Sequence, residues 1–198
     1  GSNLSGHISH KNIPGVELST GSLGHGLPVS AGIALASKLK RKNYKTFVLM
    51  SDGECDEGSN WEAALFSAHH KLNNLVAIID YNKLQSYGPV DDVLKLEPLA
   101  DKWRSFGFKV KEVNGHDIIA LESVLSELPF NTENPNIIIC HTIKGKGFPF
   151  AEQNPEWHHK SRLTDEEMQA IAKEIFGTLD GEHPGVATFL GQGNNLVA

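Results

Sequence analysis

Four short hydrophobic runs divide the chain and show the pattern expected of β-strands. Three of them, residues 46–50, 75–79 and 136–142, are continuous rather than alternating. Continuous apolar runs are typical of parallel strands that are buried on both faces of a sheet. The fourth run, residues 108–113, alternates between apolar and charged positions, so we expect it nearer an edge of the sheet.

Segments with helical periodicity separate these runs. Residues 27–39 have a face rich in Ala and Leu, with Pro28 in the first turn, where proline is tolerated. Residues 59–72 begin with Ser59 and Glu62, which have the spacing of a capping box. Both segments are therefore predicted to be helices that connect successive strands.

Two further helices are predicted in the second half of the chain. Residues 117–128 show helical periodicity and stop before Pro129. Residues 164–176 follow a second capping box, formed by Thr164 and Glu167. The alternation of strands and helices predicts an α/β fold, a parallel β-sheet flanked by helices on both faces with right-handed crossovers.

The length and composition of the chain are those of one ordinary globular domain. It has 198 residues, of which 39% are hydrophobic and 21% charged. We expect a domain over residues 1–177, shortened at its amino end, and a tail over residues 178–198 that is rich in Gly, Pro and Asn.

Net charge, hydropathy and cysteine content indicate which partners and which compartment suit the chain. The net charge of −6 does not favour a nucleic acid or an anionic membrane, and no apolar run approaches the roughly 18 residues of a membrane span. Two cysteines without a CxxC pair favour a reducing cytoplasm. Cys55 lies beside Asp56, whose charge is expected to raise the pKa of the thiol and make it a poor nucleophile.

Oxygen-bearing side chains follow two of the predicted strands. Asp52 comes after the first hydrophobic run and Asn82 after the second. Because parallel strands present their carboxyl ends at the same edge, these residues are expected to be neighbours. With the main-chain carbonyl of Leu84 they would fill half of a Mg²⁺ shell. An Asp-Gly pair after a strand also fits an ordinary turn.

Two further segments suit an anion. Gly21, Gly24 and Gly26 precede the first helix and permit close backbone approach to a group at the helix start. The loop is not a Walker loop, since no Gly-Lys-Ser/Thr follows. Lys144 and Lys146 flank a glycine after the last strand. Taken alone, the first segment also fits a flexible loop and the second a solvated lysine pair.

Together, these motifs resemble a known family. The segments PGVELSTGSLGHGL, SDGECDEGSNWEAALF, DYNKLQS, VNGHD, IKGKG and WHHK are similar to the diphosphate-binding domain of transketolases. The family motif is Gly-Asp-Gly followed at a distance by Asn, and this chain has Ser51 in place of the first glycine. The resemblance implies a thiamine diphosphate-dependent transferase that uses Mg²⁺ and moves a two-carbon ketol unit between sugars or sugar phosphates.

The resemblance also implies roles for individual residues. Asp52, Asn82 and the carbonyl of Leu84 match the metal ligands. The positions that match cofactor contacts are Leu23, Gly24, Asp52, Gly53, Glu54, Asn82, Lys144 and His158.

Four residues match catalytic positions of the family. His7 and His158 match histidines that approach the diphosphate and the substrate side of the thiazolium. Glu57 and Glu62 match acids of a subunit interface near the aminopyrimidine. The acids that follow Asp52 are therefore expected to serve an interface and a proton network.

The resemblance further implies a missing partner. In the family, the glutamate that activates the cofactor comes from a pyrimidine-binding domain across a dimer interface, and this chain is too short to contain that domain. We expect the small subunit of a split transketolase, inactive without a pyrimidine-binding transketolase-like subunit. The two would form a dimer or heterotetramer. A fragment of a longer enzyme is the other explanation. Deoxyxylulose-phosphate synthase, a 2-oxo acid dehydrogenase component and a non-catalytic scaffold stay open as alternatives.

Overall fold

The computed structural model describes residues 7–160 and 162–177. The chain divides into a larger compact unit that ends at Thr142 and a smaller unit that begins at Ile143. Each unit is described by itself below. The predicted tail, residues 178–198, lies outside the described residues.

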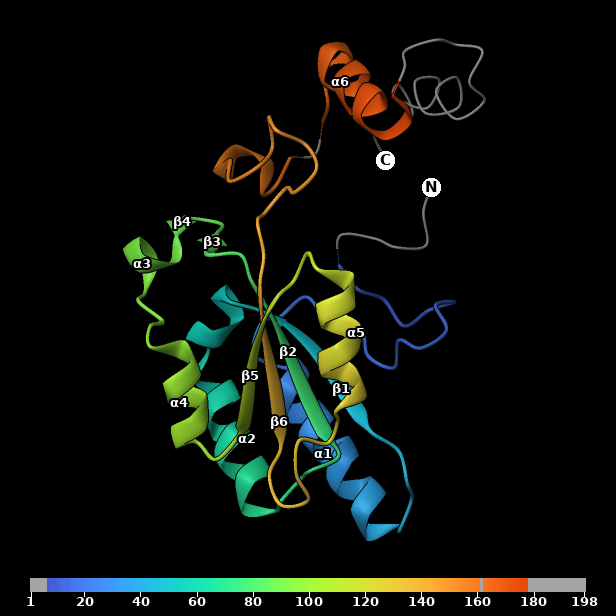
Figure 1. The fold of residues 1–198 in the computed structure, drawn as a ribbon, viewed down its shortest axis with the longest axis vertical. Coiled ribbons are helices and arrows are strands. Elements are labelled where there is room, and N and C mark those ends of the chain that lie inside the picture. Colours follow the sequence, from blue (N-terminus) through green and yellow to red (C-terminus); the bar gives the residue numbers. More distant parts are fainter. Residues whose placement is uncertain (1–6, 161, 178–198) are drawn as a thin grey trace. The chain divides into compact units, whose positions relative to one another are not determined.

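A four-stranded parallel sheet forms the centre of the larger unit (Figure 1). Its strands are β1 (Thr46–Ser51), β2 (Leu75–Tyr81), β6 (Asn136–His141) and β5 (Lys109–Asn114), in this spatial order. Every neighbouring pair is parallel. The predicted parallel sheet is therefore confirmed, as is the position of residues 108–113 at an edge.

Helices cover both faces of this sheet. Helices α1 (Gly26–Leu39), α2 (Gly58–His69) and α4 (Leu99–Ser105) share one hydrophobic core with side chains of the strands. Helix α5 (Ile118–Ser126) packs on the opposite face, where Val124 meets side chains of β2 and β6. The predicted fold class is thus confirmed for the larger unit.

Short elements complete the two units. In the larger unit they are the 3₁₀ turn η1 (Gly53–Asp56), the two-stranded antiparallel pair β3 (Leu84–Gln85) and β4 (Gly88–Pro89), and the helix α3 (Val90–Val93). The smaller unit contains the 3₁₀ turn η2 (Pro155–Trp157) and helix α6 (Asp165–Phe176). Helix α6 begins at the capping box of Thr164 and Glu167, as predicted.

The predicted capping box of α2 is wrong. The helix begins at Gly58 with Glu57 at the N-cap, and no side chain caps it. The Ser59 hydroxyl instead donates a hydrogen bond to the Gly24 carbonyl at 2.7 Å. A tertiary contact has taken the hydroxyl that the local pattern assigned to the helix end.

Strand β1 also differs from its prediction. Val48 and Met50 are buried, whereas Phe47 and Leu49 are 53% and 73% exposed. Strand β1 lies at the edge of the sheet, and α5 packs against β2 and β6 on the face to which Phe47 and Leu49 belong. Among the described residues, nothing buries the Phe47 and Leu49 face of β1, although the run of apolar residues 46–50 predicted burial on both faces.

Helix α4 was not predicted, although it fills an important part of the core. Its Trp103 is fully buried and stacks against Trp61 of α2, with ring centroids 4.8 Å apart. None of the helices in the described residues is both long enough and apolar enough to cross a membrane.

Candidate functional site

The ends of β1 and β2 bring Asp52 and Asn82 together. Ser51 is aligned with Asp80 in the parallel pairing of β1 and β2. The segments that follow these two strands therefore leave the sheet at the same edge. The Lys83 N–H donates a hydrogen bond to Asp52 Oδ2 at 2.6 Å. The Leu84 N–H donates to Asn82 Oδ1 at 3.0 Å. The carboxylate of Asp52 thus lies directly against the segment that contains the other two predicted metal ligands.

The side chains of Asp52 and Asn82 are both buried, so the negative charge of Asp52 needs hydrogen bonds or a cation to compensate it. Asp52 is 2% exposed and Asn82 is 6% exposed. A buried carboxylate is costly unless it is hydrogen-bonded or paired with a cation. Asp52 also accepts from the Gly53 N–H at 2.7 Å. The oxygen donors fit a hard cation such as Mg²⁺, which accepts one carboxylate with neutral oxygen ligands.

The donor set does not fit a zinc-type site. No group of three or more His, Cys, Asp or Glu side chains with metal-binding geometry occurs in residues 7–160 and 162–177. Structural zinc sites are built from Cys and His ligands, with occasional carboxylates. The proposed set of Asp52, Asn82 and the Leu84 carbonyl contains neither Cys nor His.

Ser51 has a structural function at the position where the family motif has glycine. Its Oγ accepts a hydrogen bond from the Glu54 N–H at 3.1 Å. Serine hydroxyls commonly satisfy backbone N–H groups in this way at the start of a helical turn. The substitution therefore supports the turn that carries Asp52, Gly53 and Glu54.

The glycine-rich loop is fixed to this turn by a buried carboxylate. The Gly24 N–H donates to Glu54 Oε1 at 2.8 Å, and Glu54 is only 9% exposed. Gly24 has φ +77°, and a Cβ atom there would lie 2.5 Å from Ser59 Oγ and 2.6 Å from Glu57 Cβ. Only glycine fits this position. The loop and the Asp52 turn thus form one local structure at the sheet edge.

The two N–H groups that the resemblance assigns to the diphosphate are engaged by carboxylates. Gly24 donates to Glu54 and Gly53 donates to Asp52. Backbone N–H groups that bind a side-chain carboxylate also suit a phosphate oxygen, because both acceptors are anionic.

The other predicted residues of the larger unit lie at its surface. Leu23 is 51% exposed. Glu57 and Glu62 are exposed near the start of α2. The His7 ring lies beside Gly21, where an added Cβ would meet His7 Cδ2 at 3.0 Å. The exposure of Glu57 and Glu62 is compatible with a subunit interface. Their role beside the aminopyrimidine stays a prediction.

Lys144 and His158 belong to the smaller unit. Burial lowers the pKa of His158 from its ordinary value, and the positive charges of Lys144 and His159 lower it further. A lowered pKa keeps the imidazole neutral at pH 7, so that it can both donate and accept hydrogen bonds. The predicted contacts of these two residues with a cofactor stay predictions.

Two site residues were missed from the sequence. Gln85 Nε2 donates to Asp56 Oδ2 at 2.9 Å, and its side chain packs against Gly53. Asn60 is fully buried and donates to the Glu54 carbonyl at 2.6 Å. Asn60 follows the acids closely in the sequence, where its pattern indicates only the start of a helix. Gln85 gave no local signal, because its partner Asp56 lies 29 residues earlier in the chain.

A raised pKa makes the buried thiol of Cys55 a poor nucleophile. Burial is the largest cause that raises the pKa of its thiol, followed by the charges of Asp52, Glu54 and Asp56. The predicted direction is confirmed. Burial, and not the neighbouring carboxylate of Asp56, is the main cause of the raised pKa. The burial of Cys55 could not be seen from the sequence alone.

The contact between Glu54 and Gly24 gives a testable prediction. Replacing Glu54 with leucine removes the acceptor of a buried N–H and should lower the free energy of unfolding by about 1–2 kcal/mol. Urea denaturation would measure the loss, and hydrogen exchange at the Gly24 amide would locate it. Glu54→Gln keeps an acceptor oxygen and serves as the control. An equal loss in both variants would show that the hydrogen bond is not responsible.

The chain is similar to known proteins in both sequence and fold. The family model described as "Transketolase, thiamine diphosphate binding domain" matches residues 1–184. The chain is also similar to the transketolase of Campylobacter jejuni, with a TM-score of 0.75 and 28% identity over 91% of this chain and 30% of that one. The match thus includes both described units.

Two curated relatives share more of the sequence. One of the subunits of the apulose-4-phosphate transketolase of Actinobacillus succinogenes is 49% identical over 171 residues, which cover 86% of this chain and 61% of that protein. The 6-deoxy-6-sulfo-D-fructose transketolase subunit SqwG of a Clostridium species is 37% identical over 175 residues, which cover 88% and 63%. The chain therefore spans less than two thirds of the length of these relatives. With the match of the family model over most of its residues, the chain belongs to the transketolase family and carries its thiamine diphosphate-binding domain.

Proposed function

We propose that this chain is one subunit of a split transketolase, which transfers a two-carbon ketol unit between sugars or sugar phosphates. Two relatives that are named as single transketolase subunits, rather than as complete enzymes, support this assignment. The proposal includes a role in carbohydrate metabolism in the cytoplasm.

The proposed metal site uses Mg²⁺ with Asp52, Asn82 and the Leu84 carbonyl as protein ligands. The observation that carries the proposal is the 2.6 Å hydrogen bond from the Lys83 N–H to Asp52 Oδ2. It holds the only charged member of the proposed set against the segment that supplies the other two. Mg²⁺ typically completes its octahedral shell with phosphate oxygens and water.

The proposed diphosphate contacts come from the loop and the turn at the same edge. Gly24 and Gly53 would donate their N–H groups, with Leu23 and Glu54 beside them. Asp52 would hold the cation next to the Gly53 N–H, where the positive charge would favour a nearby diphosphate. Bound thiamine diphosphate supplies the electron sink for breaking and forming carbon–carbon bonds. The protein would position the cofactor through the loop and the turn, and Asp52 would hold the cation beside the diphosphate.

The partner in this proposal is a pyrimidine-binding transketolase-like subunit, in a dimer or heterotetramer. Glu57 and Glu62 would meet it, since both acids are exposed at the start of α2, next to the proposed site. His7, Lys144 and His158 would face the diphosphate and the sugar. The chain alone would be inactive, because the acid that activates the aminopyrimidine belongs to the partner.

Titration calorimetry and a ketol-transfer assay test the proposal together. We expect saturable uptake of thiamine diphosphate when both Mg²⁺ and the pyrimidine-binding partner are present, with ketol transfer only in that mixture. The same mixture with EDTA is the control for the metal. If the reconstituted pair takes up no cofactor, the proposal is wrong.

A further inference from the structure

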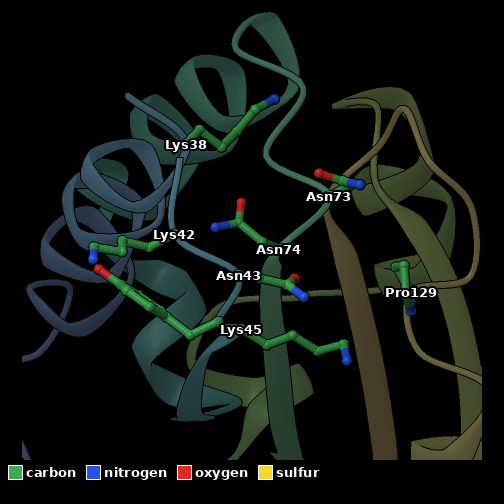
Figure 2. Close-up of a pocket in the computed structure, with 8 residues that line it drawn as sticks. Lys38, Lys42, Asn43, Lys45, Asn73, Asn74 and Pro129 are labelled. Atoms are coloured by element: carbon green, nitrogen blue, oxygen red, sulfur yellow. The ribbon is translucent and has the colours of Figure 1, made fainter. Parts of the chain in front are cut away.

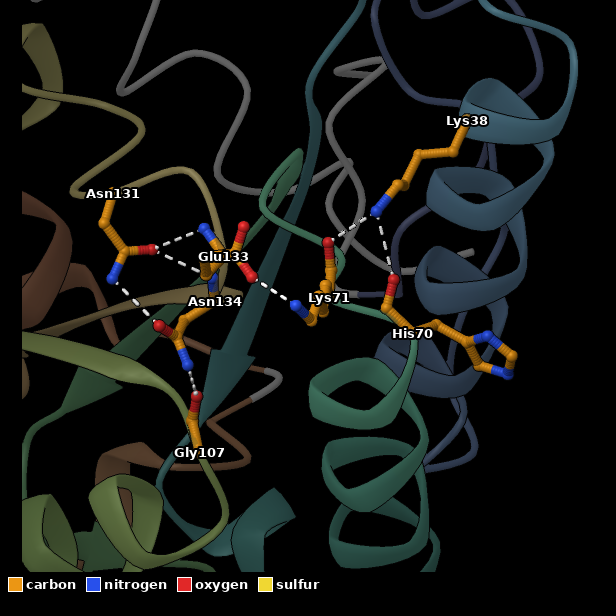
Figure 3. A network of polar contacts seen from close by, with 7 residues as sticks. All are labelled: Lys38, His70, Lys71, Gly107, Asn131, Glu133 and Asn134. Atoms are coloured by element: carbon orange, nitrogen blue, oxygen red, sulfur yellow. Dashed lines mark hydrogen bonds and ion pairs between the residues drawn. The ribbon is translucent and has the colours of Figure 1, made fainter.

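Several polar side chains at the amino ends of the strands satisfy the main chain of the connections. Lysine and asparagine side chains surround a pocket there (Figure 2). In the neighbouring network, Lys38 donates to the carbonyls of His70 and Lys71 (Figure 3). Asn134 donates to the Gly107 carbonyl in the same network. Contacts of this kind hold the connections in place, so the fold itself explains them.

The carboxylate of Asp80 lies near the opposite ends of the strands and is bound by side chains. The Thr142 hydroxyl donates to Asp80 Oδ1, and Asn82 Nδ2 donates to Asp80 Oδ2 at 3.4 Å. Asp80 belongs to β2, and Thr142 directly follows β6, which pairs with β2. Asp80 therefore connects the end of a neighbouring strand to one of the proposed metal ligands.

The two ends of the Asn82 amide are fixed by partners of opposite kinds. The Leu84 N–H can only donate, and it binds Asn82 Oδ1 at 3.0 Å. An ionised carboxylate can only accept, so the group that faces Asp80 is Asn82 Nδ2. The 3.4 Å contact is long for a hydrogen bond, so it contributes orientation more than energy. Because an amide oxygen can accept two contacts, Oδ1 has a second acceptor position for a cation.

Thr142 is itself held from two sides. Its N–H donates to the Tyr81 carbonyl at 3.2 Å. Gly115 lies against its methyl group, since a Cβ atom on Gly115 would meet Thr142 Cγ2 at 2.4 Å. The Gly115 N–H donates to the His141 carbonyl at 2.8 Å, which fixes this close approach. The methyl group of Thr142 thus faces Gly115 while its hydroxyl binds Asp80, and the glycine of the VNGHD motif makes room for this arrangement.

We propose that Asp80, anchored by Thr142, is a positioning residue that presents the oxygen of the Asn82 amide to the cation. The inference rests on the proposed Mg²⁺ site, because it assigns Asp80 a role toward a ligand of that site. Groups that hydrogen-bond to metal ligands fix the orientation of those ligands, and their loss typically lowers metal affinity about 10–100-fold. Asp80 acts through Asn82, and Thr142 acts through Asp80.

Variants of Thr142 test this role without changing any charge. Thr142→Val keeps the shape of the side chain but removes the hydroxyl. The Mg²⁺-dependent affinity of the reconstituted pair for thiamine diphosphate should then fall about fivefold, as expected for one neutral hydrogen bond. Thr142→Ser keeps the hydroxyl and should restore most of the affinity. Asp80→Ala removes the contact with Asn82 and should lower the affinity by roughly tenfold or more in the same titration calorimetry.

The Asn82 amide gives a second readout on the chain without metal or cofactor. Nuclear magnetic resonance should show that the Nδ2 proton signals of Asn82 move in Thr142→Val and Asp80→Ala but not in Thr142→Ser. A role in stability alone would leave these signals in place while the chain remains folded. Thr132 is exposed in the connection between α5 and β6, so the matched control Thr132→Val should change neither the signals nor the affinity.

The results also separate this inference from the proposed function. The inference is overturned if Thr142→Val binds the cofactor as tightly as the unchanged chain, or if Thr142→Ser loses as much affinity as Thr142→Val. Tighter binding in Thr142→Val would overturn it as well, because Asp80 would then coordinate the cation itself. These three results leave the proposed function intact. If the unchanged pair takes up no cofactor, the proposed metal site fails, and this inference fails with it.

Discussion

Replacing Asp52 with alanine should abolish Mg²⁺-dependent binding of thiamine diphosphate to the reconstituted enzyme. Asp52 is the only charged ligand in the proposed metal site, and it is 2% exposed directly after the end of β1. Loss of its charge should cost at least about 2–3 kcal/mol of binding free energy, or roughly a hundredfold in affinity. Titration calorimetry with Mg²⁺ and the cofactor measures this change.

Three further variants separate the charge from other effects. Asp52→Asn keeps the shape and an acceptor oxygen, so it should lose cofactor affinity while remaining folded. Asn82→Ala should lose less, because water can replace a neutral oxygen ligand. Asp101 is exposed in α4, well removed in sequence from the proposed ligands, so Asp101→Ala serves as a matched control. Unchanged affinity in Asp52→Asn would remove Asp52 from the metal site.

Replacing Gly24 with alanine should strongly destabilise the larger unit. The residue has φ +77°, which costs an L-amino acid about 1–2 kcal/mol. The new Cβ would also lie 2.5 Å from Ser59 Oγ and 2.6 Å from Glu57 Cβ, and such overpacking typically costs about 1–3 kcal/mol. We expect a combined loss of about 3 kcal/mol and a fall in Tm of roughly 6–12 °C by calorimetry.

Gly32→Ala is the matched control for this prediction. Gly32 lies within α1, and a Cβ there would have no atom within 4 Å. Alanine is favoured over glycine in a helix by about 0.5–1 kcal/mol, so this variant should be slightly more stable. If Gly24→Ala behaved like Gly32→Ala, the tight contact between the loop and α2 would be absent in solution.

The sequence predicted the sheet and the meeting of the Asp52 and Asn82 segments at its edge, because these depend on strong local signals. Apolar runs gave all four strands of the sheet, and the parallel topology placed Asp52 beside Asn82 without any knowledge of side-chain contacts. Helix α6 was predicted with its cap, since Thr164 and Glu167 satisfy each other within one turn. Features that are decided within a few residues were therefore accessible.

Features that depend on distant partners were not. Ser59 matched a capping pattern, yet its hydroxyl binds the Gly24 carbonyl, which lies far away in the chain. Glu54 and Gln85 reach the site through similar tertiary contacts. The exposure of Phe47 and Leu49 follows from the position of β1 in the sheet order, which no property of the run itself reveals.

That edge position has a consequence for the behaviour of the polypeptide on its own. Among the described strands, none pairs with the outer side of β1, so that side presents amide and carbonyl groups beside two large apolar side chains. An unpaired edge strand of this kind can pair with another chain and is a common origin of aggregation. The net charge of −6 opposes such sticking through mutual repulsion, and added salt weakens that protection. Purification at low ionic strength should therefore keep the isolated polypeptide dispersed.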